Sequence, residues 1–135
     1  MEDRRNFMMK LAAGMAATSL VTVSNQVSAR EISAKKVLVH HVFFWLKDPK
    51  NEDARKAFEN GLQDLVKVPL IQSYHIGTPV ESNRDVVDDS FTYSYIAFFK
   101  NQEAQSTYQT HPVHLKFIED CQHLWEKVVV YDAMN

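Results

Sequence analysis

The sequence predicts an α+β fold, a ferredoxin-like protomer in which strands and helices follow the order β-α-β-β-α-β. Two observations favour it. Short apolar segments with strand-like alternation are interrupted twice by stretches of helical periodicity, in that order. The first strand is also apolar on both faces, although one layer of helices can cover only one side of a sheet. We therefore expect a second copy of the chain to cover the other side, in a homodimer.

The first strand is expected over residues 36–47. Successive side chains in a strand point to opposite faces, so alternate positions give its two surfaces. One face carries Leu38, His40, Val42, Phe44 and Leu46, and the other carries Val39, His41, Phe43 and Trp45. His40 is thus an imidazole within an otherwise apolar set, where a polar atom is costly without a partner.

The first helix is expected after Asn51, a residue type that caps helix N-termini well. Apolar residues then recur at helical spacing from Ala54 to Val66. The later elements are expected as a strand over 70–76, a polar and acidic loop over 80–90, a strand over 91–99, a short helix over 101–108, a longer helix over 112–125 and a closing strand over 127–132. Pro112 suits the first turn of the longer helix.

Residues 1–29 have the features of an export signal. A charged start containing Arg4 and Arg5 precedes a modest apolar run, and small residues lead up to Ala29. The paired arginines resemble a twin-arginine signal, and the apolar run is too short to span a bilayer. The folded domain is therefore expected over residues 30–135.

After export we expect cleavage behind Ala29 and a periplasmic or otherwise extracytoplasmic protein with no membrane attachment. Mass spectrometry of the native protein should find a chain that begins at Arg30. A mature chain that retains Met1 would contradict this prediction.

The composition after Ala29 excludes several classes of partner. The 106 residues suffice for one domain, and they carry 12 Lys and Arg against 15 Asp and Glu. That balance provides no basic face for nucleic acid or an anionic membrane. Cys121 is the only cysteine, so no disulfide can form within the chain and the fold must depend on its core or on a partner.

The stretch Tyr108-Gln-Thr-His111-Pro-Val-His114 carries the clearest chemical signal. Histidine is the side chain whose ordinary pKa lies near neutrality, so two imidazoles three residues apart offer proton transfer or ligand binding. At helical spacing His114 shares a stripe with Ile118 and Cys121 and points toward the core. A histidine on an apolar helix face is more often a satisfied core residue than a site, but His40 could face it across the same volume.

The chain from residue 30 resembles, nearly end to end, the stress-responsive dimeric α/β-barrel (Dabb) domain family. The matching segments are His40-His-Val-Phe-Phe-Trp-Leu-Lys47, Ile76-Gly77, Phe98-Phe-Lys, Tyr108-x-x-His111-Pro-x-His114 and Trp125-Glu-Lys-Val-Val-Val-Tyr-Asp132. The resemblance implies a ferredoxin-like protomer that pairs into a dimeric α+β barrel.

At the histidine motif the chain resembles the cofactor-free polyketide cyclases of this family, of the olivetolic acid cyclase type. Their catalytic histidine and tyrosine fall on His114 and Tyr108, and their first-strand pocket histidine falls on His40. A further pocket tyrosine of these cyclases aligns near Leu62, where this sequence has no hydroxyl. That departure leaves the substrate class and the cyclase reaction open.

Our first hypothesis is a binding protein of unassigned biochemical activity. A small hydrophobic molecule would occupy a pocket lined by His40, Phe44, His111 and Phe117. His111, with the proline that follows it, would shape the helix start and the rim of the pocket. If these groups instead satisfy one another in a filled core, they are structural.

The alternative is a cofactor-free acid–base enzyme of the polyketide cyclase, isomerase or lyase type. Neutral His114 would remove a proton alpha to a carbonyl, and Tyr108 would orient it or donate to the enolate oxygen. A metal site is a weaker alternative, because Pro112 separates the His111–His114 pair and a third ligand would have to come from His40 or His75. No motif selects haem or flavin, and we expect no metal or cofactor.

Overall fold

The computed structural model describes residues 36–135, and the predicted export signal lies outside them. The elements are β1 (Leu38–Leu46), α1 (Glu52–Leu65), β2 (Ser73–Gly77), β3 (Tyr93–Phe99), α2 (Gln102–Gln109), α3 (Pro112–Cys121), the 3-10 helix η1 (Gln122–Leu124) and β4 (Trp125–Met134). This confirms the predicted ferredoxin-like order, with the second helical region divided into α2 and α3.

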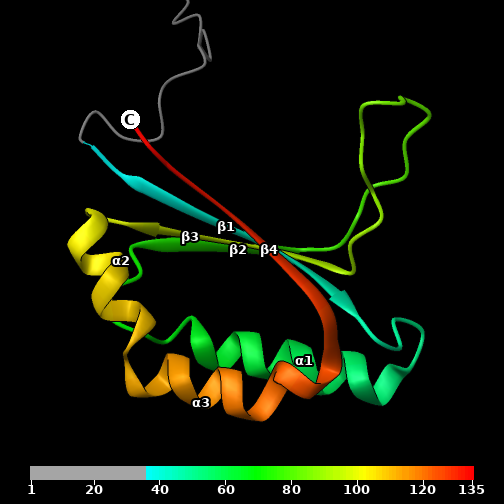
Figure 1. Cartoon of the computed structure of the whole chain (residues 1–135), viewed down its shortest axis with the longest axis horizontal. Helices are drawn as coiled ribbons and strands as arrows, with labels where there is room; N and C mark the ends of the chain where they lie inside the picture. The colour runs from blue at the N-terminus through cyan, green and yellow to red at the C-terminus, as the bar shows by residue number, and fades with distance from the viewer. Residues whose placement is uncertain (1–35) are drawn as a thin grey trace, which may run out of the picture. The chain divides into compact units, whose positions relative to one another are not determined.

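The strands form one antiparallel sheet in the order β2-β3-β1-β4. The helices lie on one side of it, and the segment that joins β2 to β3 extends on the other side (Figure 1). We call the side without helices the open face. β1 is central and pairs with both β3 and β4, so its register sets the position of every residue beneath the helices.

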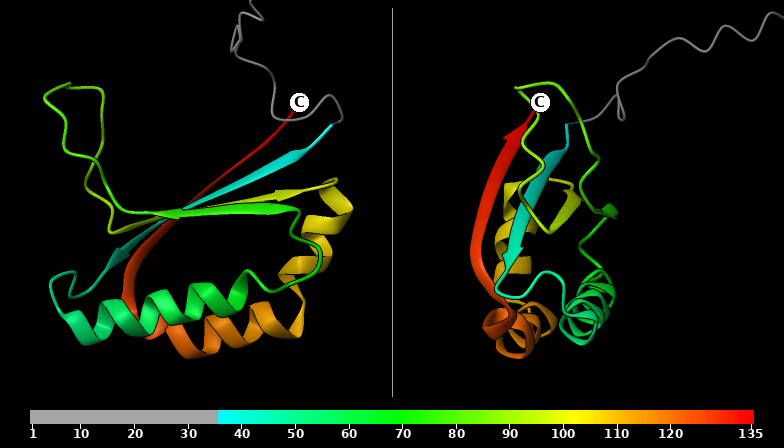
Figure 2. Two further views of the ribbon diagram at one scale, coloured as in Figure 1. Left: turned by 180° about the vertical axis from the view of Figure 1, so that it is seen from behind. Right: turned by 90° about the vertical axis from the view of Figure 1, so that its right-hand side faces the viewer.

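Helix α1 begins as the sequence predicts. The side chain of Asn51 accepts a hydrogen bond from the Ala54 backbone N–H at 3.0 Å, which satisfies one of the free donors of the first turn. Phe58, Leu62 and Leu65 then face the core and are fully buried. This apolar stripe holds α1 against the sheet, and α1 lies beside α3 (Figure 2).

The two faces of β1 are confirmed as predicted. Its five residues from Leu38 to Leu46 at alternate positions are buried beneath the helices, whereas the intervening four are only half-buried on the open face. β3 shows the same alternation, with Tyr93, Tyr95 and Phe99 buried. The hydrophobic core therefore lies wholly between the sheet and the helices.

The C-terminal end of the helix predicted over 112–125 is wrong. α3 ends at Cys121, η1 follows, and Trp125 is already extended at the start of β4. Trp125 pairs with Leu46 across the sheet, and its ring stacks on Phe117 with the ring centroids 5.8 Å apart. Tertiary packing thus overrides the helical spacing that extended the predicted helix to residue 125.

The second and third strands are shorter than predicted. β2 starts at Ser73, because the preceding chain still turns, with the Ile71 N–H donating to the Val68 carbonyl. β3 starts at Tyr93, because the Thr92 hydroxyl accepts a hydrogen bond from the Leu46 N–H at 3.0 Å instead of continuing a regular ladder. Among the described residues, no helix is long and apolar enough to cross a membrane.

Candidate functional site

A cavity of about 150 Å³ lies between the sheet and the helices. Its lining is mainly apolar, with five polar side chains that come from three separate segments of the chain. The lining residues are His40, Val42, Phe44, Leu65, Tyr95, Tyr108, Gln109, His114, Phe117, Ile118, Trp125, Val128 and Val130. Strands β1, β3 and β4 and all three α-helices contribute to it. The structure therefore brings His40, Tyr108 and His114 together, as predicted from the sequence.

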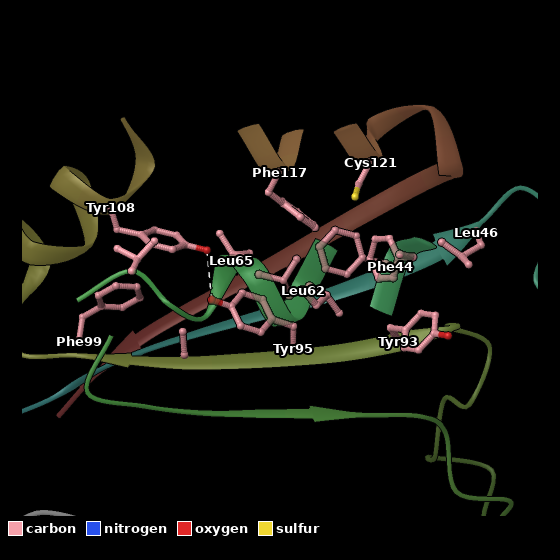
Figure 3. Close-up of a cluster of buried hydrophobic side chains, with 14 of the residues drawn as sticks. Phe44, Leu46, Leu62, Leu65, Tyr93, Tyr95, Phe99, Tyr108, Phe117 and Cys121 are labelled. Atoms are coloured by element: carbon pink, nitrogen blue, oxygen red, sulfur yellow. Dashed lines mark hydrogen bonds between the residues drawn. The ribbon is translucent and has the colours of Figure 1, made fainter. Parts of the chain in front are cut away.

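Tyr108 reaches the cavity from α2 and is fully buried. Its hydroxyl lies 3.1 Å from the hydroxyl of Tyr95 (Figure 3). Burial raises the pKa of Tyr108 far above its ordinary value and raises the pKa of Tyr95 to about 12. Both phenols therefore stay protonated at neutral pH. Since two hydroxyls share one hydrogen bond, one proton remains to be donated to a ligand.

Tyr95 is the hydroxyl-bearing cavity residue that sequence reasoning missed. It points beneath the helices because it shares the buried face of β3 with Tyr93 and Ala97. That alternation was visible in the sequence, but nothing there placed Tyr95 beside Tyr108. Leu62 is core and does not line the cavity.

His114 lies on the first turns of α3, against the ring of Tyr108, with the ring centroids 4.7 Å apart. Burial holds the pKa of His114 below its ordinary value; the Gln109 backbone carbonyl partly opposes this, and His40 lowers it slightly further. The Nδ1 atom of His114 is buried and has no hydrogen-bond partner among the described residues. His114 is therefore a neutral imidazole with an unused polar atom.

His40 has a charged partner that the sequence analysis did not foresee. Its Nδ1 lies 2.6 Å from Oδ1 of Asp132, the residue directly opposite it on β4. The His40 ring is edge-on to Tyr108 at a centroid distance of 5.8 Å. Strand alternation could have suggested this pair, because it places His40 and Asp132 on the same face of two predicted strands. The sequence did not show, however, in which register the two strands pair.

The other predicted pocket residues divide into two groups. Phe44 and Phe117 line the cavity, as expected. His111 does not line it. Its Nδ1 accepts a hydrogen bond from the Val113 N–H at 3.1 Å and caps α3, because a ring at the N-cap can satisfy a free donor of the first turn. His111 thus shapes the helix start without joining the pocket.

The metal alternative receives no support from the side-chain positions. Among residues 36–135, no three His, Cys, Asp or Glu side chains come together in a way that could hold a metal ion. His75 lies on the open face, in register with Ile96 and His41, whereas His40 faces the helices. His111 is occupied in capping α3. The histidines that might have formed one site therefore belong to different surfaces.

The model of the stress-responsive A/B barrel domain matches residues 38–135 of this chain. The chain belongs to this family. The match covers every strand and helix described above, including the whole cavity. Among curated proteins, no match to this sequence is found.

Solved structures of the same fold come from bacteria and plants. A Dabb family protein with a ferredoxin-like fold from Mesorhizobium loti is 21% identical, with a TM-score of 0.61, 73% of this chain and 96% of that one being covered. Hydroxynitrile lyase from Passiflora edulis is 20% identical, with a TM-score of 0.64 and coverages of 73% and 93%. A dimeric ferredoxin-like protein of unknown function from Thermobifida fusca is 15% identical, with a TM-score of 0.60 and coverages of 80% and 100%. At these identities the likeness shows the fold.

The buried tyrosine pair predicts a loss of stability in alkali. Between the ordinary phenol pKa of 10.0 and about 12, Tyr95 ionises in the unfolded chain but not in the folded one. The free energy of unfolding should therefore fall as pH rises through this window, by up to about 1.4 kcal/mol per pH unit for this residue. Urea unfolding at several pH values measures it. The slope should be smaller in Tyr95→Phe, and an unchanged slope would contradict the burial of this hydroxyl.

Proposed function

We propose that this protein binds a small, uncharged, mainly apolar molecule that carries one oxygen function in the cavity beneath the sheet. The observation that carries the proposal is the convergence of His40, Tyr108 and His114, from three elements, on one apolar volume. Such polar groups are normally satisfied when they are buried. The unpartnered Nδ1 of His114 and the spare proton of the tyrosine pair instead leave a donor and an acceptor for a ligand.

The size and charge of the cavity restrict the ligand. A volume of about 150 Å³ is close to that of an engineered apolar cavity that binds benzene. Pockets for drug-sized ligands begin at about 300 Å³, so a single ring with a short substituent is the expected size. No Lys or Arg is among the described residues that line the cavity. A carboxylate or phosphate would lack a partner there, and a ketone, aldehyde or alcohol would not.

Cyclohexanone is a suitable probe, because it is one uncharged ring with a carbonyl. We expect it to shift the NMR signals of His114, and we expect cyclohexanecarboxylate at equal concentration not to do so. Ile118→Trp should abolish the shifts, because Ile118 lines the cavity and a larger side chain would fill it.

Leu115→Trp is the matched control, since Leu115 lies on the same helix but is exposed. Both variants must keep the circular dichroism spectrum of the parent chain. Equal loss of binding in both, or binding that survives Ile118→Trp, would place the ligand elsewhere.

We also propose that the protein is a homodimer formed through the open face. On this face Phe43 packs against His41 and Phe91, with ring centroids 4.1 and 5.0 Å away, yet all three remain only half-buried in one copy. Val129 and Tyr131 on β4 extend the same apolar surface. Solved relatives of this fold, the Thermobifida fusca protein among them, are dimeric.

Sedimentation velocity tests the dimer. The parent chain should sediment with twice its monomer mass, and Phe43→Lys should sediment as a monomer, because it places an unpaired charge in the interface. Leu115→Lys, on a helix remote from the open face, should remain dimeric. A monomeric parent chain, or a dimeric Phe43→Lys variant, would contradict the assignment.

Acid–base catalysis on the bound molecule is a second candidate function. It is favoured by two imidazoles, those of His40 and His114, that line the same cavity as the protonated phenol of Tyr108. An imidazole can move a proton, and a phenol can stabilise an enolate oxygen. The Passiflora edulis protein of this fold is a hydroxynitrile lyase, so the scaffold can carry an enzyme.

Exchange of the alpha protons of cyclohexanone in D2O tests this candidate without knowledge of the natural substrate. The protein should accelerate exchange over buffer, and Tyr108→Phe should reduce the acceleration by about tenfold or more, since it removes the donor to the enolate oxygen. Mass spectrometry of the recovered ketone measures the rate. If cyclohexanone binds but its exchange is not accelerated, the protein binds simple ketones without catalysing enolisation, and acid–base catalysis is excluded for them.

A further inference from the structure

The contact between His40 and Asp132 is the shortest polar contact of the cavity wall, at 2.6 Å between Nδ1 and Oδ1. The two residues are cross-strand partners in the ladder of β1 and β4, so their side chains leave the sheet on the same face. The side chain of His40 is 6% exposed and that of Asp132 is 46% exposed. One partner is therefore held inside the protein while the other reaches solvent at the sheet edge.

This contact determines where His40 carries its proton. An ionised carboxylate can only accept hydrogen bonds, so Nδ1 must be the N–H donor. In the neutral ring the lone pair is then on Nε2. The same arrangement orients the general base of catalytic triads, where the carboxylate also stabilises the imidazolium that forms.

Nε2 is the ring nitrogen of His40 that is left for a ligand. His40 lines the cavity, its Nδ1 is occupied by Asp132, and Nε2 has no hydrogen-bond partner in the described chain. The rings of Tyr95, Phe99 and Tyr108 surround the imidazole edge-on, at centroid distances of 5.8 to 6.4 Å, and hold its plane in place.

His114 lacks these features. Among residues 36–135 no carboxylate forms a hydrogen bond or ion pair with it and its Nδ1 has no partner, and burial holds its pKa below the ordinary value. A proton taken up by His114 would therefore produce a charge with no partner in an apolar wall. The same ring can accept or donate a hydrogen bond without ionising.

We infer that His40 is the proton acceptor of this cavity, with Asp132 as its positioning residue, and that His114 binds the ligand oxygen. This rests on the proposed acid–base function. In the step, Nε2 of His40 removes a proton from the carbon alpha to a carbonyl. The C–H electron pair becomes the C=C bond of the enolate, and the carbonyl π pair moves to the oxygen. Tyr108 and His114 stabilise that oxygen, and return of a proton from His40 to carbon restores the ketone.

The matched variants are His40→Gln and His114→Gln, since glutamine can still hydrogen-bond but cannot act as a base. In the cyclohexanone assay we expect His40→Gln to reduce the acceleration of proton exchange by at least about 100-fold, a typical contribution of a general base. His114→Gln should retain measurable exchange. Asp132→Asn should reduce the acceleration by at least about tenfold, while its Kd for cyclohexanone stays within about threefold of the parent value. Glu126 is an exposed carboxylate on the same strand, so Glu126→Gln should accelerate exchange as much as the parent chain does.

Nitrogen-15 NMR of the parent chain gives a readout that needs no turnover. His40 should be the neutral tautomer with the proton on Nδ1, and Asp132→Asn should change the Nδ1 signal of His40. A proton on Nε2 would overturn the inference, as would exchange that survives in His40→Gln but is lost in His114→Gln. If cyclohexanone does not bind, the proposed function fails for this probe, and the tautomer still decides whether Asp132 positions His40.

Discussion

The pairing of β1 with its two neighbours is the constraint on which the rest of the structure depends. Because β1 is central, its register with β3 and β4 decides which residues face the helices at each level of the sheet. At the level of His40 this register supplies Asp132 from one side and Ala97 from the other. The charged partner thus lies directly beside the imidazole, and on the side of the small alanine the rings of Tyr95 and Phe99 pack edge-on against it. A shift of one residue would turn His40 to the open face.

The cavity wall illustrates how a protein of this size can keep polar groups inside an apolar core. Each buried polar atom without a partner costs on the order of 1–3 kcal/mol, so such atoms persist where they serve a purpose. His40 is stabilised by Asp132, and Tyr95 and Tyr108 satisfy each other. His114 keeps an unpartnered nitrogen. This unpartnered nitrogen is the reason that the proposed ligand oxygen is assigned to the His114 end of the cavity.

Membership of the stress-responsive A/B barrel family accounts for the architecture and leaves the reaction open. Solved relatives of this fold include a hydroxynitrile lyase and proteins of unknown function, at identities that show only the fold. A common scaffold carries different chemistry because function lies in the side chains that line the cavity. In this chain those side chains include a tyrosine from β3 beside the histidine motif, and a carboxylate from β4 contacts the lining residue His40 from outside the lining.

The sequence by itself determined the order of the elements and the two-faced first strand, and it marked His40, Tyr108 and His114 as residues that could face one volume, because periodicity reports which face a residue occupies. Only the tertiary structure decided which residues meet across strands. It added Tyr95 and Asp132, removed His111 from the cavity and ended α3 before Trp125. These outcomes depend on strand register and on packing between distant segments, and neither leaves a local signal in the chain.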